Sequence, residues 1–346
     1  MNMLKDLKFD TDPNKFKYQQ IVDCFIDNIS KGNIKKNQTL PSINVFSKEY
    51  KVSRDTVEKA YKVLKSKNII AANKGKTTYV QSTEISVKKN ILYLMNKMND
   101  YKSRVYNSFI DELGDNFNID IEIYHCDESH FLKLLEKNIG NYDYYVIMPH
   151  FKSNHAKEFS FSDKAVEVIK KIPRNQLVIL DNNDLSVDGD IIEIYQDFEN
   201  DVYNALLNGK DKIINHKKMI VRIPENEQFS YQHKIYRGCK KFCIEHNMDY
   251  EVSSTDNLNL QKGELQFIID DDDLVNVIDA INDNKLKIGK DIGVLSYNET
   301  PLKRLLGIAV ISTDFKKMGK TAAKMLMERK KGKIKNTFSF INRKSI

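Results

Sequence analysis

"LPSINVFSKEYKVSRDTVEKAYKVL", residues 40–64, contains two short amphipathic stretches, and each begins at a serine. Pro41 disfavours helix at the residue before it, so Ser42 is placed to cap the first stretch. Ser53 can cap the second stretch in the same way, and Asp55 adds favourable negative charge to its first turn. Two short helices joined by a tight turn predict a helix-turn-helix motif.

The flanking residues extend this motif. Apolar residues at spacings of three and four over residues 18–29 predict a preceding helix that ends near Lys31 and Gly32. After the motif, an apolar run at 69–72, a turn at 73–76 and an alternating run at 77–80 predict a β-hairpin with a basic tip. Three helices followed by such a hairpin predict a winged helix, whose third helix, led by Arg54, can enter a major groove.

The positive charge of the chain is concentrated in this first quarter. Residues 1–82 hold 16 of the 55 Lys+Arg and 8 of the 48 Asp+Glu, which leaves 39 and 40 for residues 83–346. The first quarter is therefore at +8 and the remainder at −1. A small basic segment joined to a neutral bulk indicates a polyanion, double-stranded DNA, as the partner of that segment.

Residues 16–82 resemble the winged-helix domain of GntR-family transcription regulators, through "LPS", "SRDTV", the spacing "AY..L" and the wing glycine. The resemblance implies that Arg54 reads a base edge, that Ser53 and Thr56 hold phosphates, and that the wing tip enters the minor groove. The sequence departs from many members at Asn44 and Glu58, where they have arginine. The residues expected to contact DNA are Ser42, Asn44, Ser53, Arg54, Thr56, Gly75 and Lys76.

Residues 83–88 belong to a polar, unpatterned stretch and are expected to form a linker between a DNA-binding domain, residues 1–82, and an effector domain, residues 89–346. Strand and helix patterns alternate after this linker, and the alternation starts again near residue 217. Strands are predicted at 91–98, 119–126, 142–150, 176–184, 217–225, 250–255, 265–270 and 291–298, and helices at 101–114, 129–140, 163–173, 231–247, 273–283 and 314–332. This order predicts an α/β domain with two doubly wound parallel lobes.

The second domain resembles the effector domain of LacI-type regulators, which is similar to periplasmic sugar-binding proteins. The stretches that carry the resemblance are "FIIDDDDLVNVIDAI", "KIGKDIGVLSYNETP", "GIAVISTDFKKMGKTAAKML" and "FSFINRKS". The whole chain thus resembles chimeras of the arabinose-repressor type. The expected fold is an N-terminal winged helix-turn-helix followed by a bilobed, doubly wound, periplasmic-binding-protein-like domain.

A small-molecule site is expected where the strand ends of the two lobes face each other. Sugar hydroxyls donate and accept hydrogen bonds, so a sugar site needs carboxylates and amides together with aromatic faces. The LacI resemblance implies such roles for Asp197, Asp271 and Asn298. It also places the family's sugar-gripping arginine at Ile235, so that His233 or Lys234 would have to substitute for it. The residues expected to bind the effector are Asn99, Tyr101, His150, Phe151, Asp197, His233, Asp271 and Asn298.

The sequence therefore predicts a cytoplasmic homodimeric repressor that is controlled by a monosaccharide or sugar derivative. No cofactor, metal or membrane partner is expected, because no long apolar segment is present and Cys239, Cys243 and His246 lack a fourth ligand. An enzyme is not expected, because no nucleophile, base or phosphate cradle stands out. The alternative interpretation is a regulator whose cleft binds a non-sugar metabolite or a protein.

Overall fold

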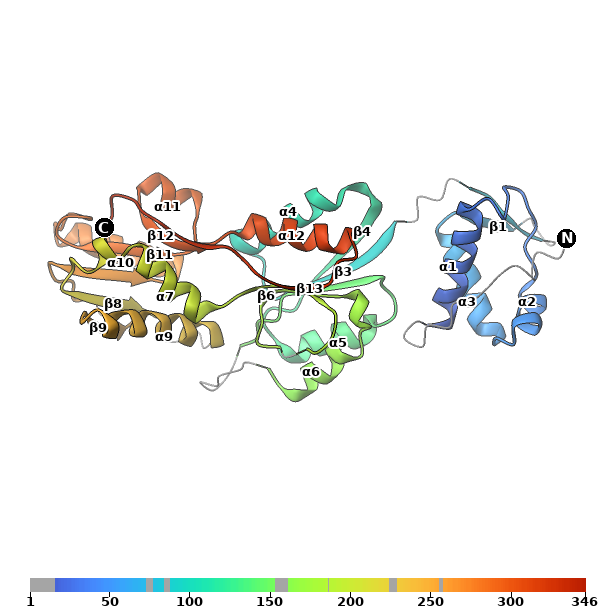
Figure 1. Cartoon of the computed structure of the whole chain (residues 1–346), viewed down its shortest axis with the longest axis horizontal. Coiled ribbons are helices and arrows are strands. Elements are labelled where there is room, and N and C mark those ends of the chain that lie inside the picture. The colour runs from blue at the N-terminus through green and yellow to red at the C-terminus, as the bar shows by residue number, and fades with distance from the viewer. Residues whose placement is uncertain are drawn as a thin grey trace. The chain divides into compact units, whose positions relative to one another are not determined.

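The computed structural model describes residues 16–72, 77–83, 88–152, 161–185, 187–223, 229–254 and 258–346 (Figure 1). The chain divides into two compact units, of which the first ends at Lys89 and the second begins at Asn90. Within the described ranges, no helix is both long and apolar enough to span a bilayer.

The first unit is a three-helix domain with a β-hairpin. Its elements are α1 (Lys17–Ser30), α2 (Ile43–Tyr50), α3 (Arg54–Ser66), β1 (Ile70–Ala72) and β2 (Thr78–Val80). β1 and β2 pair antiparallel. The buried rings of Phe25, Phe46 and Tyr61 lie 5.6–6.4 Å apart at the centre of the core, and the Tyr61 hydroxyl donates to the Pro41 carbonyl at 2.7 Å.

Both predicted helix caps are present. The Ser42 hydroxyl accepts from the Val45 N–H at 3.3 Å, and the Ser53 hydroxyl accepts from the Thr56 N–H at 3.2 Å. These bonds satisfy N–H groups that the first helical turn leaves without a partner. The predicted winged helix-turn-helix is confirmed; the predicted turn at 73–76 lies outside the described residues.

The second unit contains two six-stranded sheets. The first has the strand order β13-β7-β6-β5-β3-β4, and the second has the order β14-β12-β11-β10-β8-β9. The strands of the first sheet are β3 (Lys89–Met95), β4 (Phe117–Ile123), β5 (Tyr144–Ile147), β6 (Leu177–Asn182), β7 (Ile192–Gln196) and β13 (Gly332–Lys335). Those of the second are β8 (Lys218–Arg222), β9 (Asp249–Ser253), β10 (Glu264–Ile268), β11 (Gly293–Tyr297), β12 (Ala309–Thr313) and β14 (Phe338–Ile341). β14 runs antiparallel to β12, while β8 to β12 are parallel.

Helices cover both faces of each sheet, which makes each lobe doubly wound. The helices of the first lobe are α4 (Asp100–Leu113), α5 (Glu128–Asn138), α6 (Asp163–Lys170) and α12 (Phe315–Met327), with 3₁₀ turns η2 (Gly114–Asn116) and η3 (Arg174–Gln176). Those of the second lobe are α7 (Phe198–Asn208), α8 (Lys210–Ile213), α9 (Ser230–Glu245), α10 (Asp271–Asp283) and α11 (Pro301–Leu306). One hydrophobic core lies under α4 and α12, and a separate core lies under α5 and α6. The predicted parallel, bilobed architecture is confirmed.

Two helix pairs pack closely because a glycine lies at each contact. α4 and α12 run side by side (Figure 1), and a Cβ on Gly319 would lie 2.2 Å from the Val105 carbonyl oxygen. α7 packs on α9, where a Cβ on Gly238 would lie 2.5 Å from the Glu199 carbonyl oxygen.

The chain passes between the lobes three times: from β7 to α7, from β12 to α12, and from β13 to β14. The Asn336 amide group joins these passages, since its Nδ2 donates to Thr313 Oγ1 at 2.8 Å and to the Asp314 carbonyl at 2.9 Å. The Asn336 backbone N–H donates to the Tyr195 carbonyl at 2.7 Å. Several elements were not predicted: β7, α7, β12, β13 and β14 at these passages, and α11 within the second lobe.

Candidate functional site

The first unit exposes the N-terminal ends of α2 and α3. Asn44, Ser53 and Arg54 are exposed there, and the hydroxyls of Ser53 and Thr56 are 2.6 Å apart. Ser42 is also exposed at the start of α2. Five of the seven residues expected to contact DNA therefore lie at the starts of two consecutive helices; the other two, Gly75 and Lys76, fall outside the described residues.

Glu58 stands where many GntR members have arginine, and it forms an ion pair with a residue of its own helix. The Lys62 ammonium lies 3.1 Å from its carboxylate, and this hydrogen bond and charge hold the pKa of Glu58 below its usual range. This pairing between residues four apart is typical of a solvated helix surface.

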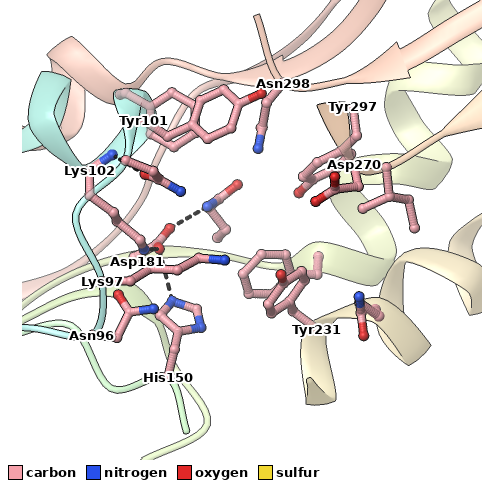
Figure 2. Close-up of a pocket in the computed structure, with 16 residues that line it drawn as sticks. Asn96, Lys97, Tyr101, Lys102, His150, Asp181, Tyr231, Asp270, Tyr297 and Asn298 are labelled. Atoms are coloured by element: carbon pink, nitrogen blue, oxygen red, sulfur yellow. Dashed lines mark hydrogen bonds and ion pairs between the residues drawn. The ribbon is translucent and has the colours of Figure 1, made fainter. Parts of the chain in front are cut away.

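A cavity of about 110 Å³ lies between the two lobes of the second unit, where the carboxyl ends of their strands meet (Figure 2). A single buried water needs about 10–15 Å³, so this space suits a small ligand. Its amide side chains are Asn96, Asn99, Gln196, Gln232 and Asn298; its rings are Tyr101, His150, Phe198, Tyr231, Tyr297 and Phe315; and its charged groups are Lys97, Lys102, Asp181 and Asp270, beside Ile269.

The Asp181 carboxylate lies at the base of the cavity and has three partners. One oxygen pairs with the Lys102 ammonium and lies 2.8 Å from His150 Nε2, while the other accepts from the Gln196 amide. Asp181 and Lys102 are buried. Burial alone would raise the pKa of Asp181, but the positive charge of Lys102 and the contact with His150 outweigh it and hold that pKa well below its usual range.

Burial acts in the opposite direction on His150. Burial first, and the nearby Lys102 ammonium second, lower the pKa of the imidazole although it contacts Asp181. His150 is therefore neutral at physiological pH, and the cluster contains one cation and one anion. Asp181 also has φ = 80°, a backbone conformation that non-glycine residues rarely adopt and that is common at functional sites.

Four buried polar atoms of cavity residues have no hydrogen-bond partner within the described part of the chain. They are Asn96 Oδ1, Gln196 Oε1, Tyr297 OH and Asn298 Oδ1. A buried polar atom without a partner is costly, so such atoms in a native fold indicate a further binding partner. Three carbonyl-type acceptors and one phenol match a ligand with several hydroxyl groups.

Aromatic rings form the adjoining wall of the cavity. The Tyr231 ring lies 5.5 Å from Phe198 and 5.8 Å from His150, and it stacks on Phe229 at 5.4 Å. Flat rings beside hydrogen-bonding groups suit a ligand with both C–H and hydroxyl faces.

Direct contacts join the lobes on both sides of this cavity. On one side, the Tyr101 hydroxyl donates to Asp271 at 2.8 Å, and the buried Lys303 ammonium lies 2.6 Å from the other Asp271 oxygen. On the other side, Asp184 of the first lobe pairs with Lys234 and accepts from the Ser230 hydroxyl at 3.1 Å. The cleft is therefore closed by polar contacts between its own side chains.

Half of the eight residues expected to bind the effector line this cavity: Asn99, Tyr101, His150 and Asn298. Asn99 also caps α4, because its side chain accepts from the Lys102 N–H at 3.0 Å. The structure thus brings together Asn99 and Tyr101 after the first predicted strand, His150 at the end of the third, and Asn298 at the end of "LSYN".

The other four lie outside the cavity lining, each for a local reason. Phe151 is fully buried in the first-lobe core, about 5 Å from the rings of Tyr124 and Phe131. Asp197 caps α7 by accepting from Asn200, and His233 is exposed on α9. Asp271 contacts Tyr101 of the first lobe and Lys303 of its own lobe, while the neighbouring Asp270 lines the cavity.

The cavity also contains residues that the sequence did not single out, chiefly Asn96, Lys97, Lys102, Asp181 and Gln196. Asp181 could have been found from the sequence, because it is a charged residue at the end of the otherwise apolar strand "LVILD". Within the part of the chain described, no three His, Cys, Asp or Glu residues are grouped to hold a metal ion.

Comparison with known families agrees with both units. Residues 17–80 match the family of bacterial regulatory proteins designated gntR, and residues 215–339 match the periplasmic binding protein-like domain. No curated protein sequence matches the chain.

Solved structures of transcription regulators, LacI family members among them, share the fold. The lac repressor dimer bound to operator and the anti-inducer ONPF is 13% identical with a TM-score of 0.61, over 75% of this chain and 94% of that chain. A LacI family regulator from Lactobacillus casei with bound glucose is 16% identical with a TM-score of 0.56, over 74% and 99%. A putative transcription regulator from Staphylococcus saprophyticus is 18% identical with a TM-score of 0.54, over 74% and 97%. At these identities the likeness concerns the fold.

Proposed function

We propose that this chain, a DNA-binding transcription regulator in which a gntR-type domain precedes a LacI-like ligand-binding domain, is a repressor of sugar-utilisation genes. A small carbohydrate bound between the lobes would control its affinity for operator DNA. The observation that carries this proposal is the interlobe cavity, where buried amide and phenol oxygens without partners lie beside aromatic rings.

The chemistry of the cavity supports a polyhydroxylated ligand. Each sugar hydroxyl can donate to one acceptor, such as Asn298 Oδ1, and accept from an amide N–H of the same wall. The rings of Phe198 and Tyr231, which line the cavity, offer apolar surface for the C–H groups of a pyranose or furanose. A structure of the same fold with bound glucose is consistent with this ligand class.

In binding DNA, Arg54 would contact the edge of a base, and Ser53 and Thr56 would contact phosphates. Arg54 leads α3 and is exposed, so its guanidinium is free to reach a guanine edge in a major groove. Such a protein works in the cytoplasm, where the chromosomal DNA of a bacterium lies.

A homodimer would hold two such domains on a near-palindromic operator. α11 supports this assembly, since Leu302, Leu305 and Leu306 are 61%, 82% and 48% exposed on a six-residue helix. Exposed leucines gathered in this way are typical of an interface between subunits. Closure of the lobes need change operator affinity by only about 1–3 kcal/mol to alter occupancy 5- to 150-fold.

The proposal is tested by measuring binding of the full chain to the DNA upstream of its own gene, with and without a panel of monosaccharides. We expect a steep salt dependence, protection of an inverted repeat, and release by at least one sugar. Arg54→Ala should bind operator and random DNA equally. If Arg54→Ala kept its discrimination, base reading by Arg54 would be excluded.

A thermal-shift screen with the same sugars tests the effector, because a ligand of the native state raises the melting temperature. If no sugar does so, a non-sugar metabolite or a protein partner becomes the better interpretation of the cleft. Ile235, which stands where the LacI resemblance places a sugar-gripping arginine and is fully buried in the second-lobe core, favours that alternative.

A further inference from the structure

Lys97 is a cation of the cavity that has no anionic partner within the described residues. It follows β3, and Figure 2 shows its side chain extending into the cavity toward Tyr231. Its Nζ lies 5.6 Å from the centre of the Phe229 ring, and none of the ion pairs between described residues includes it.

The first-lobe carboxylate that lines the cavity already has partners of its own. Asp181 pairs with Lys102, lies 2.8 Å from His150 Nε2 and accepts from Gln196. A second ammonium would have to displace one of these contacts. The Lys97 ammonium is therefore available to pair with an anionic group of a ligand in the cavity.

We infer that the effector is a monosaccharide-sized sugar acid whose carboxylate pairs with Lys97; the inference rests on the proposed sugar-responsive function. A face of Phe229 at 5.6 Å compensates only weakly for the partial loss of water around an ammonium group. A ligand carboxylate would supply a charge-assisted hydrogen bond, which is about twice as strong as a neutral one.

The lining favours a carboxylate over a phosphate. Among the described lining residues there is no arginine, the side chain best suited to bind phosphate oxygens in pairs. A phosphate ester also brings nearly two negative charges, whereas Lys97 offers one positive charge. The cavity of about 110 Å³ is small as well.

The opposite wall fixes the direction of the ligand. Asp270 of the second lobe lines the cavity, and one of its oxygens accepts from the Asp272 N–H at 3.0 Å at the start of α10. Its negative charge repels a carboxylate but accepts hydroxyl groups well. The acid end of the ligand therefore lies at Lys97 in the first lobe, and its hydroxyl end lies at Asp270 and Asn298 in the second.

The test measures dissociation constants of the full chain for sodium D-gluconate, D-glucuronate and D-galacturonate, beside D-glucose, D-galactose and glucose 6-phosphate at equal ionic strength. We expect at least one sugar acid to bind more tightly than the neutral sugars and the phosphate. Lys97→Met should raise its dissociation constant about ten- to a hundredfold, as loss of a charged hydrogen bond does.

Two further variants at position 97 and one control variant separate the effect of charge from other causes. Lys97→Gln keeps a hydrogen-bond donor without the charge and should also lose affinity for the acid, while Lys97→Arg should largely restore it. Lys133→Met removes an exposed lysine of α5 in the same lobe and should change nothing.

The outcomes separate this inference from the proposed function. Tight binding of a neutral sugar that is insensitive to Lys97→Met would overturn the sugar acid and leave the sugar-controlled repressor standing. Tighter binding of glucose 6-phosphate would overturn the carboxylate. Absence of binding by all six compounds would count against both.

Discussion

Replacing Lys234 by methionine removes a contact that holds the two lobes together. The Lys234 ammonium pairs with Asp184 of the first lobe, and the Asp184 side chain is only 3% exposed in the closed form. Without its cation, this carboxylate keeps the Ser230 hydroxyl at 3.1 Å as a partner across the cleft. Opening of the cleft would return Asp184 to water, so the variant should favour the open form.

The size of the effect follows from burial. Leaving one charge of a buried ion pair without its partner costs about 3–5 kcal/mol. The cost here should be lower, at about 2–3 kcal/mol, because Lys234 is 16% exposed and Ser230 remains. That free energy shifts the ratio of open to closed forms by about 30- to 160-fold.

Small-angle X-ray scattering of the full chain and ligand titration measure the two consequences. Lys234→Met should open the cleft and weaken effector binding in proportion to the lost closed population. Lys240→Met, which removes an exposed lysine of the same helix, should do neither. A cycle with Asp184→Asn isolates the coupling between the two side chains. Unchanged scattering and unchanged affinity in Lys234→Met would refute the reasoning.

Three further perturbations test local features. Ser53→Ala removes the cap of α3 and should destabilise that helix by about 1 kcal/mol. Hydrogen exchange of the backbone amides in the first turns of α3 should then be roughly fivefold faster. Ser53→Asp keeps a capping oxygen and should leave the exchange rates unchanged. Gly319→Ala places a Cβ 2.2 Å from the Val105 carbonyl oxygen, so it should lower the free energy of unfolding by about 1–3 kcal/mol. Urea titration measures this free energy. Lys320→Ala, at an exposed position of the same helix, should have little effect. Burial lowers the pKa of His150 in the folded chain below the ordinary value of about 6.5 that it has when unfolded, so the unfolded chain takes up the proton at a higher pH than the folded chain does. The free energy of unfolding of the parent chain should therefore fall as the pH is lowered from 7.5 to 5.5, by about 1 kcal/mol more than that of His150→Gln. His125 is exposed, and His125→Gln should show the same fall as the parent chain.

Local sequence was sufficient for the first unit because its determinants are local. Ser42 and Ser53 satisfy N–H groups three residues away, and the apolar positions of α3 repeat with the helical period. The parallel lobes were also predictable, since buried strands and amphipathic helices alternate with characteristic lengths.

The lobe crossings were harder to predict because their pairing is not local. β13 carries exposed side chains and is a strand only because it pairs with β7, far earlier in the chain. Within β7, the buried Glu193 interrupts the apolar run, and Lys333 Nζ of β13 lies 2.9 Å from its carboxylate. Neither residue indicates a strand until its partner is known.

The candidate site was half predictable for a similar reason. Asn99 and Asn298 could be found because strand ends face the cleft, but the same reasoning applied equally to Asp197, which caps a helix instead. Lys102 lies on an amphipathic helix, where a lysine normally faces solvent. Its pairing with Asp181 depends on two segments that meet only in the folded lobe.

The position of β13 has a consequence for synthesis on the ribosome. The first lobe contains β3 near its start, yet its sheet is completed only by β13, after the whole of β8 to β12 has been made. The amino-terminal unit, by contrast, is one continuous segment that ends by residue 89. Because continuous domains fold as they emerge, the gene product acquires its DNA-binding domain early and its ligand-binding domain only when translation is almost finished. A prematurely terminated chain would therefore carry the folded amino-terminal unit without the completed lobes that enclose the cavity.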